Sequence, residues 1–347
     1  MKLDHSFAAS AGLIVTRLRL LLPGVFLICC CAVTAAQETE KSETLKIETT
    51  LVSVPVIVSD SQGRYVPGLQ AADFALYENR LKQQVDFFAA VEEPLNVALL
   101  LDTSFSARNV LDDIRDAARD FIRQLRPQDR AMVVSFDWRV NTLSPLTGDR
   151  KALERAVKEA RIGEQLGTVL RAAVDQVLRG EFKSLKGRKA IILLTDGKDA
   201  GSRIGPQPLL ETVTEADTLI YTVFYTTGLS QERERMRMGR RGGVLASSPE
   251  QRERRERRER RVEARNEVAV DFLQALAEAS AGRYYRSEVT NLKKTFGLIA
   301  DELRHQYRLG FYPPDHPPGS THSLRVEVAR PGLVVRARRS YRVVEQQ

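Results

Sequence analysis

The segment 95–106, LNVALLLDTSFS, constrains the fold of this chain more than any other. Its apolar part has the composition of a strand that is buried on both faces, and it ends in Asp102, Ser104 and Ser106. Alternate residues of an extended chain point to the same side, so these three side chains can converge where the chain leaves a sheet. Carboxylate and hydroxyl oxygens suit Mg²⁺ that keeps part of its water shell. We therefore expect half of a divalent-metal site here.

Two later segments can supply the other half. A second apolar run, 188–194, is followed at once by Asp196, and Gly167 leads into Thr168 at the start of a helical pattern. Ligands of open parallel sheets bind outside the carboxyl ends of the strands, so Thr168 and both aspartates are expected at one edge. The alternative for the serines is that they cap the following helix, and one serine could do both.

In this order, Asp102, Ser104, Ser106, Thr168 and Asp196 resemble the metal-ion-dependent adhesion site of von Willebrand factor type A (VWFA) domains, which reads Asp-x-Ser-x-Ser, then Thr, then Asp. The resemblance implies a Rossmann-like α/β domain whose five residues hold Mg²⁺, or Mn²⁺ or Ca²⁺. It also implies a protein partner whose Asp or Glu completes the metal shell.

The flanks of this region are similar to those of a bacterial group of VWFA-related proteins with short β segments on both sides of the domain. The similar stretches are VSVPVIVSDSQGRYVPGLQAADFALYEN before the domain, and ELRHQYRLGFYPP and VRARRSYR after it. Alternating apolar residues predict strands over 52–58, 74–78, 85–88, 324–328 and 333–344. Neither flank, with roughly 40 residues, can bury a sufficient core alone. We expect one composite β-sandwich built from 47–92 and 310–347.

The segment between the flanks, 93–309, alternates strand and helix patterns and predicts a doubly wound α/β domain. The expected strands are 97–101, 131–136, 190–194 and 218–225, and the expected helices are 110–125, 149–161, 168–178, 268–279 and 292–304.

An Arg/Glu-rich insertion, 231–265, interrupts this pattern. It holds thirteen Arg and seven Glu, and residues 1–36 add a net charge of +2, which together account for the whole formal charge of +8. The remaining surface is balanced, so we expect no nucleic-acid partner. The insertion has almost no apolar face and predicts either a solvated helix with Glu/Arg pairs or disorder. The alternative is a contact with an acidic surface such as phospholipid headgroups or nucleic acid.

The N-terminus predicts export. Arg17 and Arg19 precede an apolar run over 20–33, and small residues up to Ala36 offer a cleavage site, so 1–36 is predicted to be a signal peptide followed by a flexible leader, 37–46. The alternative is an uncleaved membrane anchor. Cleavage removes all three cysteines and leaves a periplasmic or secreted protein without thiols.

Other chemistry has weaker support. The alternative to a binding protein is a phosphohydrolase that uses the same metal ion as a Lewis acid, but the sequence places no general acid or base beside it. No G-x-S-x-G motif or P-loop occurs. His316 and His322, six residues apart, could bind a transition metal, although ordinary loop histidines have the same pattern. We expect a binding protein and not an enzyme; the oligomeric state is left open.

Overall fold

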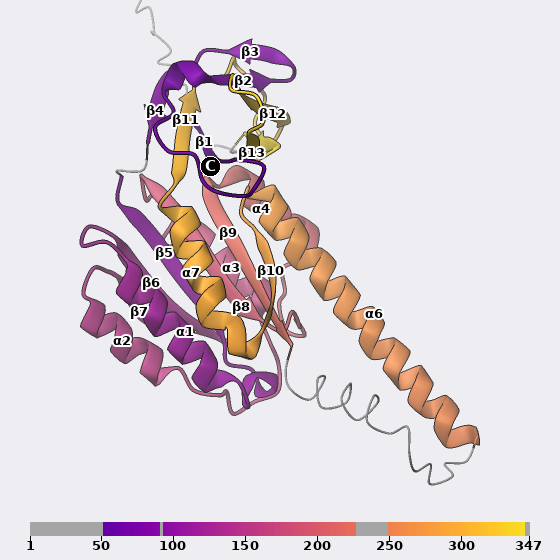
Figure 1. Cartoon of the computed structure of the whole chain (residues 1–347). Helices are drawn as coiled ribbons and strands as arrows, with labels where there is room; N and C mark the ends of the chain where they lie inside the picture. Colours follow the sequence, from indigo (N-terminus) through magenta and orange to yellow (C-terminus); the bar gives the residue numbers. More distant parts are fainter. Residues whose placement is uncertain (1–50, 91–92, 227–248, 344–347) are drawn as a thin grey trace, which may run out of the picture. The chain divides into compact units, whose positions relative to one another are not determined.

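The computed structural model describes residues 51–90, 93–226 and 249–343, which all belong to one compact unit, Glu48–Gln347. These residues form three β-sheets and the helices that cover the central one (Figure 1). The predicted signal peptide and leader lie outside the described residues. No helix within the described ranges is long and apolar enough to cross a membrane.

The central sheet has six strands in the order β10-β9-β8-β5-β6-β7. Five strands are parallel, and β7 is antiparallel to β6. Their bounds are β5 Leu95–Asp102, β6 Arg130–Phe136, β7 Val140–Thr147, β8 Arg188–Thr195, β9 Thr218–Thr226 and β10 Tyr284–Glu288. Every residue of β5 and β8 is buried, as their continuous apolar sequences predict for strands covered on both faces.

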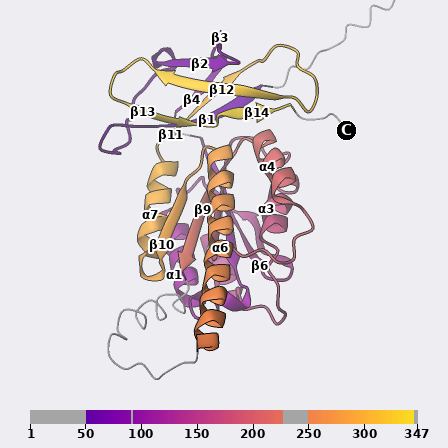
Figure 2. The same cartoon turned by 90° about the vertical axis from the view of Figure 1, so that its right-hand side faces the viewer.

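Helices cover both faces of this sheet, which confirms the doubly wound fold. One face packs against α1 Leu111–Gln124, α2 Arg150–Glu159 and α7 Leu292–Leu303, and the other against α3 Leu170–Arg179, α4 Pro206–Glu215 and α6 Pro249–Ala279 (Figure 2). Within β5, Leu99 faces the first layer and Leu100 the second, so both positions carry apolar side chains.

Strands β7 and β10 and helix α4 were not expected from the sequence pattern. Strands β7 and β10 are the two edges of the sheet, where Pro145 and polar residues are tolerated because one side of the strand has no partner. Helix α4 starts with a proline, which favours the first turn of a helix but gives little periodic signal in ten residues.

The two antiparallel sheets are assembled from both flanks, which confirms the composite sandwich. Their orders are β13-β1-β11-β4 and β14-β12-β2-β3. Strand β1, from the N-terminal flank, lies between β11 and β13, and β12 lies beside β2. The bounds are β1 Val52–Ser59, η1 Ala71–Asp73, β2 Phe74–Glu78, β3 Leu81–Gln83, β4 Phe87–Ala89, β11 Gln306–Phe311, β12 Thr321–Val328, β13 Val334–Ala337 and β14 Ser340–Arg342.

Three expectations need correction. The expected boundary at 309/310 falls inside β11, whose residues pair with β1 throughout. The single strand expected over 333–344 is two strands in different sheets, β13 and β14. The break is at Arg338, which is buried and donates to the backbone oxygens of Ser53 and Ala216, so this residue turns the chain from one sheet to the other.

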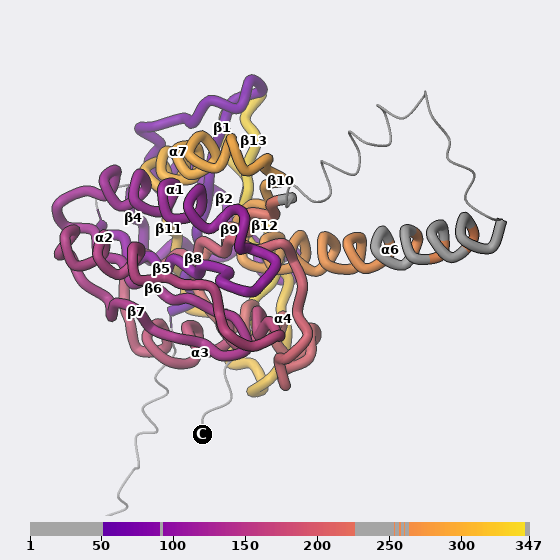
Figure 3. Tube along the Cα trace, turned by 90° about the horizontal axis from the view of Figure 1, so that it is seen from below, coloured from indigo at the N-terminus to yellow at the C-terminus, as the bar shows by residue number. Residues whose placement is uncertain are grey.

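The third correction concerns α6. The expected helix, 268–279, is only the C-terminal part of α6, which begins at Pro249 and so includes 249–265 of the Arg/Glu-rich insertion (Figure 3). Glu253 and Arg257 are exposed and form an ion pair at 2.9 Å, one helical turn apart. The helical alternative therefore holds for the backbone of 249–265, where Glu253, Arg257 and Arg260 are exposed; 231–248 lie outside the described residues.

The sandwich joins the central domain at the amino ends of the parallel strands. Arg188, the first residue of β8, donates to the Gln306 side chain at 3.2 Å and to the Leu303 backbone oxygen. The carboxyl ends of the strands therefore lie at the opposite edge of the sheet, away from this junction.

Candidate metal-binding site

The two aspartates of the predicted site end neighbouring strands. Asp102 is the last residue of β5, and Asp196 directly follows β8. These strands are parallel, with Leu101 opposite Leu194, so both carboxylates come to the same edge of the sheet. Both are buried, with exposed fractions of 0% and 5%.

The serines lie in the loop after β5. The backbone N–H of Ser104 donates to Asp102 Oδ1 at 2.9 Å, and the hydroxyls of Ser104 and Ser106 are 3.1 Å apart. Ser104 precedes the short helix η2, Phe105–Ala107, yet within the described structure its side chain makes no capping hydrogen bond. The capping alternative for Ser104 is therefore wrong, and its hydroxyl stays beside the carboxylate.

Thr168 is positioned by its backbone. It lies two residues before α3 and is buried. Its carbonyl accepts from the N–H groups of Ala200 and Gly201, both at 3.0 Å, which ties its loop to the segment that follows Asp196. The structure thus brings the Thr168 loop and the Asp196 loop together at the carboxyl edge of the sheet.

Thr195 also belongs to the site, although the sequence did not point to it. Its hydroxyl donates to Asp102 Oδ2 at 2.8 Å and accepts from the backbone N–H of Gly197 at 2.9 Å. Both carboxylate oxygens of Asp102 are thereby fixed, one by Ser104 and one by Thr195. The only sequence signal was that Thr195 is the first polar residue at the end of a strand adjacent to β5.

The charges at this edge are not balanced. Burial, and then the negative charge of Asp196, raise the pKa of Asp102 to about 6. Asp196 is paired with the ammonium group of Lys198, whose side chain is 57% exposed. Two buried carboxylates, of which only Asp196 is paired with a lysine, favour binding of a further positive charge.

A buried hydroxyl near the two carboxylates also favours a bound ion with its water molecules at this place. Among the described residues Tyr225 Oη, on β9, has no hydrogen-bond partner. Burial, and then the charges of Asp102 and Asp196, raise the pKa of this hydroxyl well above its ordinary value. Buried polar groups are normally satisfied, so an ion with its water molecules would complete this environment. Two carboxylates and three hydroxyls fit a hard divalent cation.

Comparison with known proteins identifies the family of this part of the chain. Residues 97–198 match the family model described as von Willebrand factor type A domain. The chain contains a von Willebrand factor type A domain. The matched range runs from β5 to two residues beyond Asp196 and includes all five predicted ligands. No curated protein matches the chain.

Several solved structures are similar. BatB from Bacteroides thetaiotaomicron is 16% identical with a TM-score of 0.42, over 60% of this chain and 97% of that chain. A von Willebrand factor type A protein from Catenulispora acidiphila is 13% identical with a TM-score of 0.44, over 79% and 74%. Proximal thread matrix protein 1 of the mussel byssus, with a zinc-occupied MIDAS (metal-ion-dependent adhesion site) motif, is 13% identical with a TM-score of 0.46, over 64% of this chain and 49% of that chain.

Proposed function

We propose that this VWFA domain binds a protein partner through a divalent cation, Mg²⁺ in the first instance, held by Asp102, Ser104, Ser106, Thr168 and Asp196. The observation that carries the proposal is the pair of buried carboxylates at adjoining strand ends, with the pKa of Asp102 raised to about 6. An Asp or Glu of the partner takes an open coordination position. Because the protein supplies only two carboxylates, the ion keeps a net positive charge or neutrality that favours binding of a further anionic ligand.

The surface around the site supports docking of a protein. Phe105, Trp138 and Leu166 have exposed fractions of 51%, 38% and 85%. Phe105 separates the two serines, and Leu166 lies two residues before Thr168. A Cβ atom on Gly167 would lie 3.2 Å from Trp138 Cβ, so that ring adjoins the Thr168 loop. Exposed aromatic side chains of this kind are enriched in protein interfaces.

The charges beside these rings support an acidic partner. The guanidinium of Arg108 lies 4.1 Å from the centre of the Phe105 ring, and that of Arg139 lies 5.0 Å from the centre of the Trp138 ring. Both arginines are exposed. A carboxylate that approaches the ion meets a surface of complementary sign, which favours association and correct orientation.

Export is part of the proposal because the N-terminal pattern carries it. The partner would then be an envelope or extracellular protein, and the protein itself periplasmic or secreted, or held by an N-terminal anchor if the signal is retained. A membrane-surface contact through 231–265 would be a separate interaction that does not need the ion.

A pull-down from envelope and culture-medium extracts tests the proposal. Wild-type protein in Mg²⁺ should capture a partner that is lost on adding EDTA and in Asp102→Ala. The matched control is Asp112→Ala, which removes an exposed carboxylate of α1 that pairs only with Arg115 in the described structure. Capture that persists in EDTA and in Asp102→Ala would contradict the proposal.

The phosphohydrolase alternative is separated by one assay. Hydrolysis of p-nitrophenyl phosphate that requires Mg²⁺ and disappears in Asp102→Ala, with Asp112→Ala unaffected, would make the ion a Lewis acid in catalysis. We expect no turnover above the Asp102→Ala background.

A further inference from the structure

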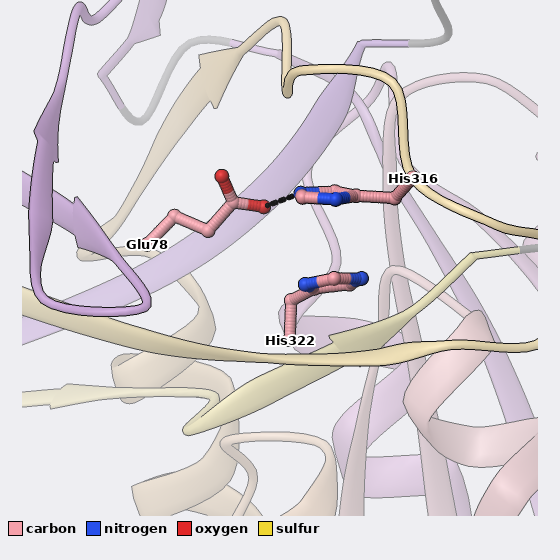
Figure 4. Close-up of side chains that lie close together, drawn as sticks. All are labelled: Glu78, His316 and His322. Carbon is pink, nitrogen blue, oxygen red and sulfur yellow. Dashed lines mark hydrogen bonds and ion pairs between the residues drawn. The ribbon is translucent and has the colours of Figure 1, made fainter.

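A second cluster of metal-ligand side chains lies inside the sandwich. It consists of Glu78 at the end of β2, His316 in the connection from β11 to β12, and His322 in β12 (Figure 4). One candidate ligand atom from each residue lies within 4.8 Å of the other two. Glu78 is 2% exposed, and both histidines are half-buried.

The strand patterns show why these polar side chains point inward. In β2, Phe74, Leu76 and Glu78 are the buried positions of an alternating strand, so the carboxylate takes a place in the row that faces the core. In β12, His322 is in the same alternating row as the buried Leu324. A carboxylate in a core row requires a charged or hydrogen-bonded partner.

The three side chains already contact one another. His316 Nε2 donates to Glu78 Oε1 at 2.9 Å. The rings of His316 and His322 are stacked, with centroids 3.5 Å apart and planes at 17°. Each ring offers one nitrogen within 4.8 Å of a Glu78 carboxylate oxygen, and imidazole nitrogens are common metal ligands.

We propose that Glu78, His316 and His322 bind a divalent transition-metal ion of the zinc type. Two imidazole nitrogens and one carboxylate oxygen are a ligand set that Zn²⁺ prefers, whereas Mg²⁺ and Ca²⁺ prefer oxygen ligands alone. This site therefore selects a different ion from the one expected at Asp102. Three protein ligands leave the fourth position of a tetrahedral site to water or to an exogenous ligand.

Binding of the ion requires small movements of the three ligand side chains. Ligands at about 2.0–2.2 Å from a tetrahedral zinc ion are about 3.4 Å apart, so donors within 4.8 Å must approach by up to about 1.4 Å. The two stacked imidazole rings must also rotate. Their nitrogen lone pairs lie in nearly parallel planes and so do not point at a common ion. His316 lies outside any helix or strand, so its side chain can make this turn. The ion takes the place of the proton on His316 Nε2, which moves to Nδ1 or is released to water.

Neighbouring side chains orient the ligands. The Asn79 amide donates to His322 Nδ1 at 2.9 Å, so the proton of this ring is on Nε2, which contacts Ser320 Oγ at 2.7 Å. The Nδ1 lone pair becomes available to an ion when the amide moves aside, and the Ser320 contact keeps the ring oriented. Tyr341 donates its hydroxyl proton to Glu78 Oε1. Such outer contacts are typical of metal sites and strengthen them.

The ion would join the two flanks of the sandwich. Glu78 belongs to the N-terminal flank and both histidines to the C-terminal flank, and Glu78 and His316 are 238 positions apart. A link that closes so long a loop lowers the entropy of the unfolded chain, and an ion that binds only the folded state stabilises it. Zinc should therefore raise the thermal midpoint.

Zinc titration by calorimetry tests the site. The Asp102→Ala protein in excess Mg²⁺ is used, so that the strand-edge site does not contribute. We expect one Zn²⁺ per chain, and a dissociation constant raised at least tenfold by a further His316→Ala or His322→Ala change. The matched control is His305→Ala. The ring of His305 stacks on Tyr65, with centroids 5.1 Å apart, and lies outside the cluster, so its removal should leave zinc affinity unchanged.

A second readout keeps the test decisive if an alanine variant folds poorly. Bound Co²⁺ should show the visible absorption of a four-coordinate site, and Glu78→Gln, which preserves side-chain shape, should lower its intensity in protein with native circular dichroism. The proposal is overturned if the folded Asp102→Ala protein binds no zinc, or binds it equally well without both histidines. Loss of zinc binding here leaves partner binding at Asp102 untouched, so the two proposals fail separately.

Discussion

The hydroxyl of Tyr65, in the N-terminal flank, donates to the carboxylate of Glu302, on the last helix of the VWFA domain, at 3.0 Å. Glu302 is fully buried and also accepts from Tyr221 at 2.7 Å and from Arg336 of β13. Arg283 lies 3.4 Å from the same carboxylate. One buried anion thus connects the central domain with strands of both flanks.

We predict that Glu302→Ala lowers the free energy of unfolding by about 3 kcal/mol, because it leaves Arg336 and two tyrosine hydroxyls without their buried partner. Urea denaturation measures the change. The control is Asp301→Ala, which removes the neighbouring carboxylate, 54% exposed, and should cost less than about 1 kcal/mol. Equal effects of both substitutions would contradict a junction that depends on Glu302.

Lys198 forms an ion pair with Asp196 and would compete with an ion bound at the proposed site. Replacing it by methionine in Lys198→Met removes a cation beside the site but keeps a side chain of similar length. We expect Mg²⁺ affinity by calorimetry to rise about two- to fivefold, the small factor appropriate to an exposed charge. Weaker binding in this variant would show that Lys198 supports the site.

Stability without metal should depend on the pH through Asp102. Its pKa in the folded protein, about 6, lies above its ordinary value of 3.8, so the folded state holds this proton more tightly than the unfolded state. The stabilisation is complete below pH 4 and is lost as the pH rises through 6. In EDTA, Asp102→Asn should lack this part of the loss, which falls between about pH 4 and pH 6.5. Parallel thermal midpoints of wild type and variant over that range would refute the raised pKa.

Truncation tests the shared core of the flanks. Deleting 324–347 removes β13 and β14, the larger part of β12 (residues 324–328), and the buried Leu324 and Tyr341. Each large buried side chain stabilises the fold by roughly 1.5–3 kcal/mol. We expect the N-terminal strand β1 to become sensitive to proteolysis, as followed by mass spectrometry of the fragments. Unchanged protection of β1 would show that the flanks fold independently.

Export predicts a processed N-terminus. Expression in a bacterial host followed by intact-mass measurement of the periplasmic and medium fractions should give a chain that begins near Ala36 or Gln37 and contains no cysteine. A full-length chain in the membrane fraction would instead support the N-terminal anchor.

Local sequence was sufficient for the centre of the fold. The apolar runs that end at Asp102 and Asp196 predict buried strands because a strand covered on both faces needs apolar residues along most of its length. The same runs place the two aspartates at strand ends, and the family resemblance is confirmed by the match over 97–198. That these residues hold an ion stays a prediction.

Tertiary structure decided what depends on partners far away in the sequence. The edge strands β7 and β10 have weak patterns, because one side of each has no neighbouring strand. Thr195 can donate a hydrogen bond to Asp102 only because β8 pairs with β5. Glu78 lies beside His316 and His322 only because β2 pairs with β12, which is more than 200 positions further along the sequence. Alternation in each strand shows which side chains face inward, but the register between strands, set by the packing of the whole core, determines which of them meet.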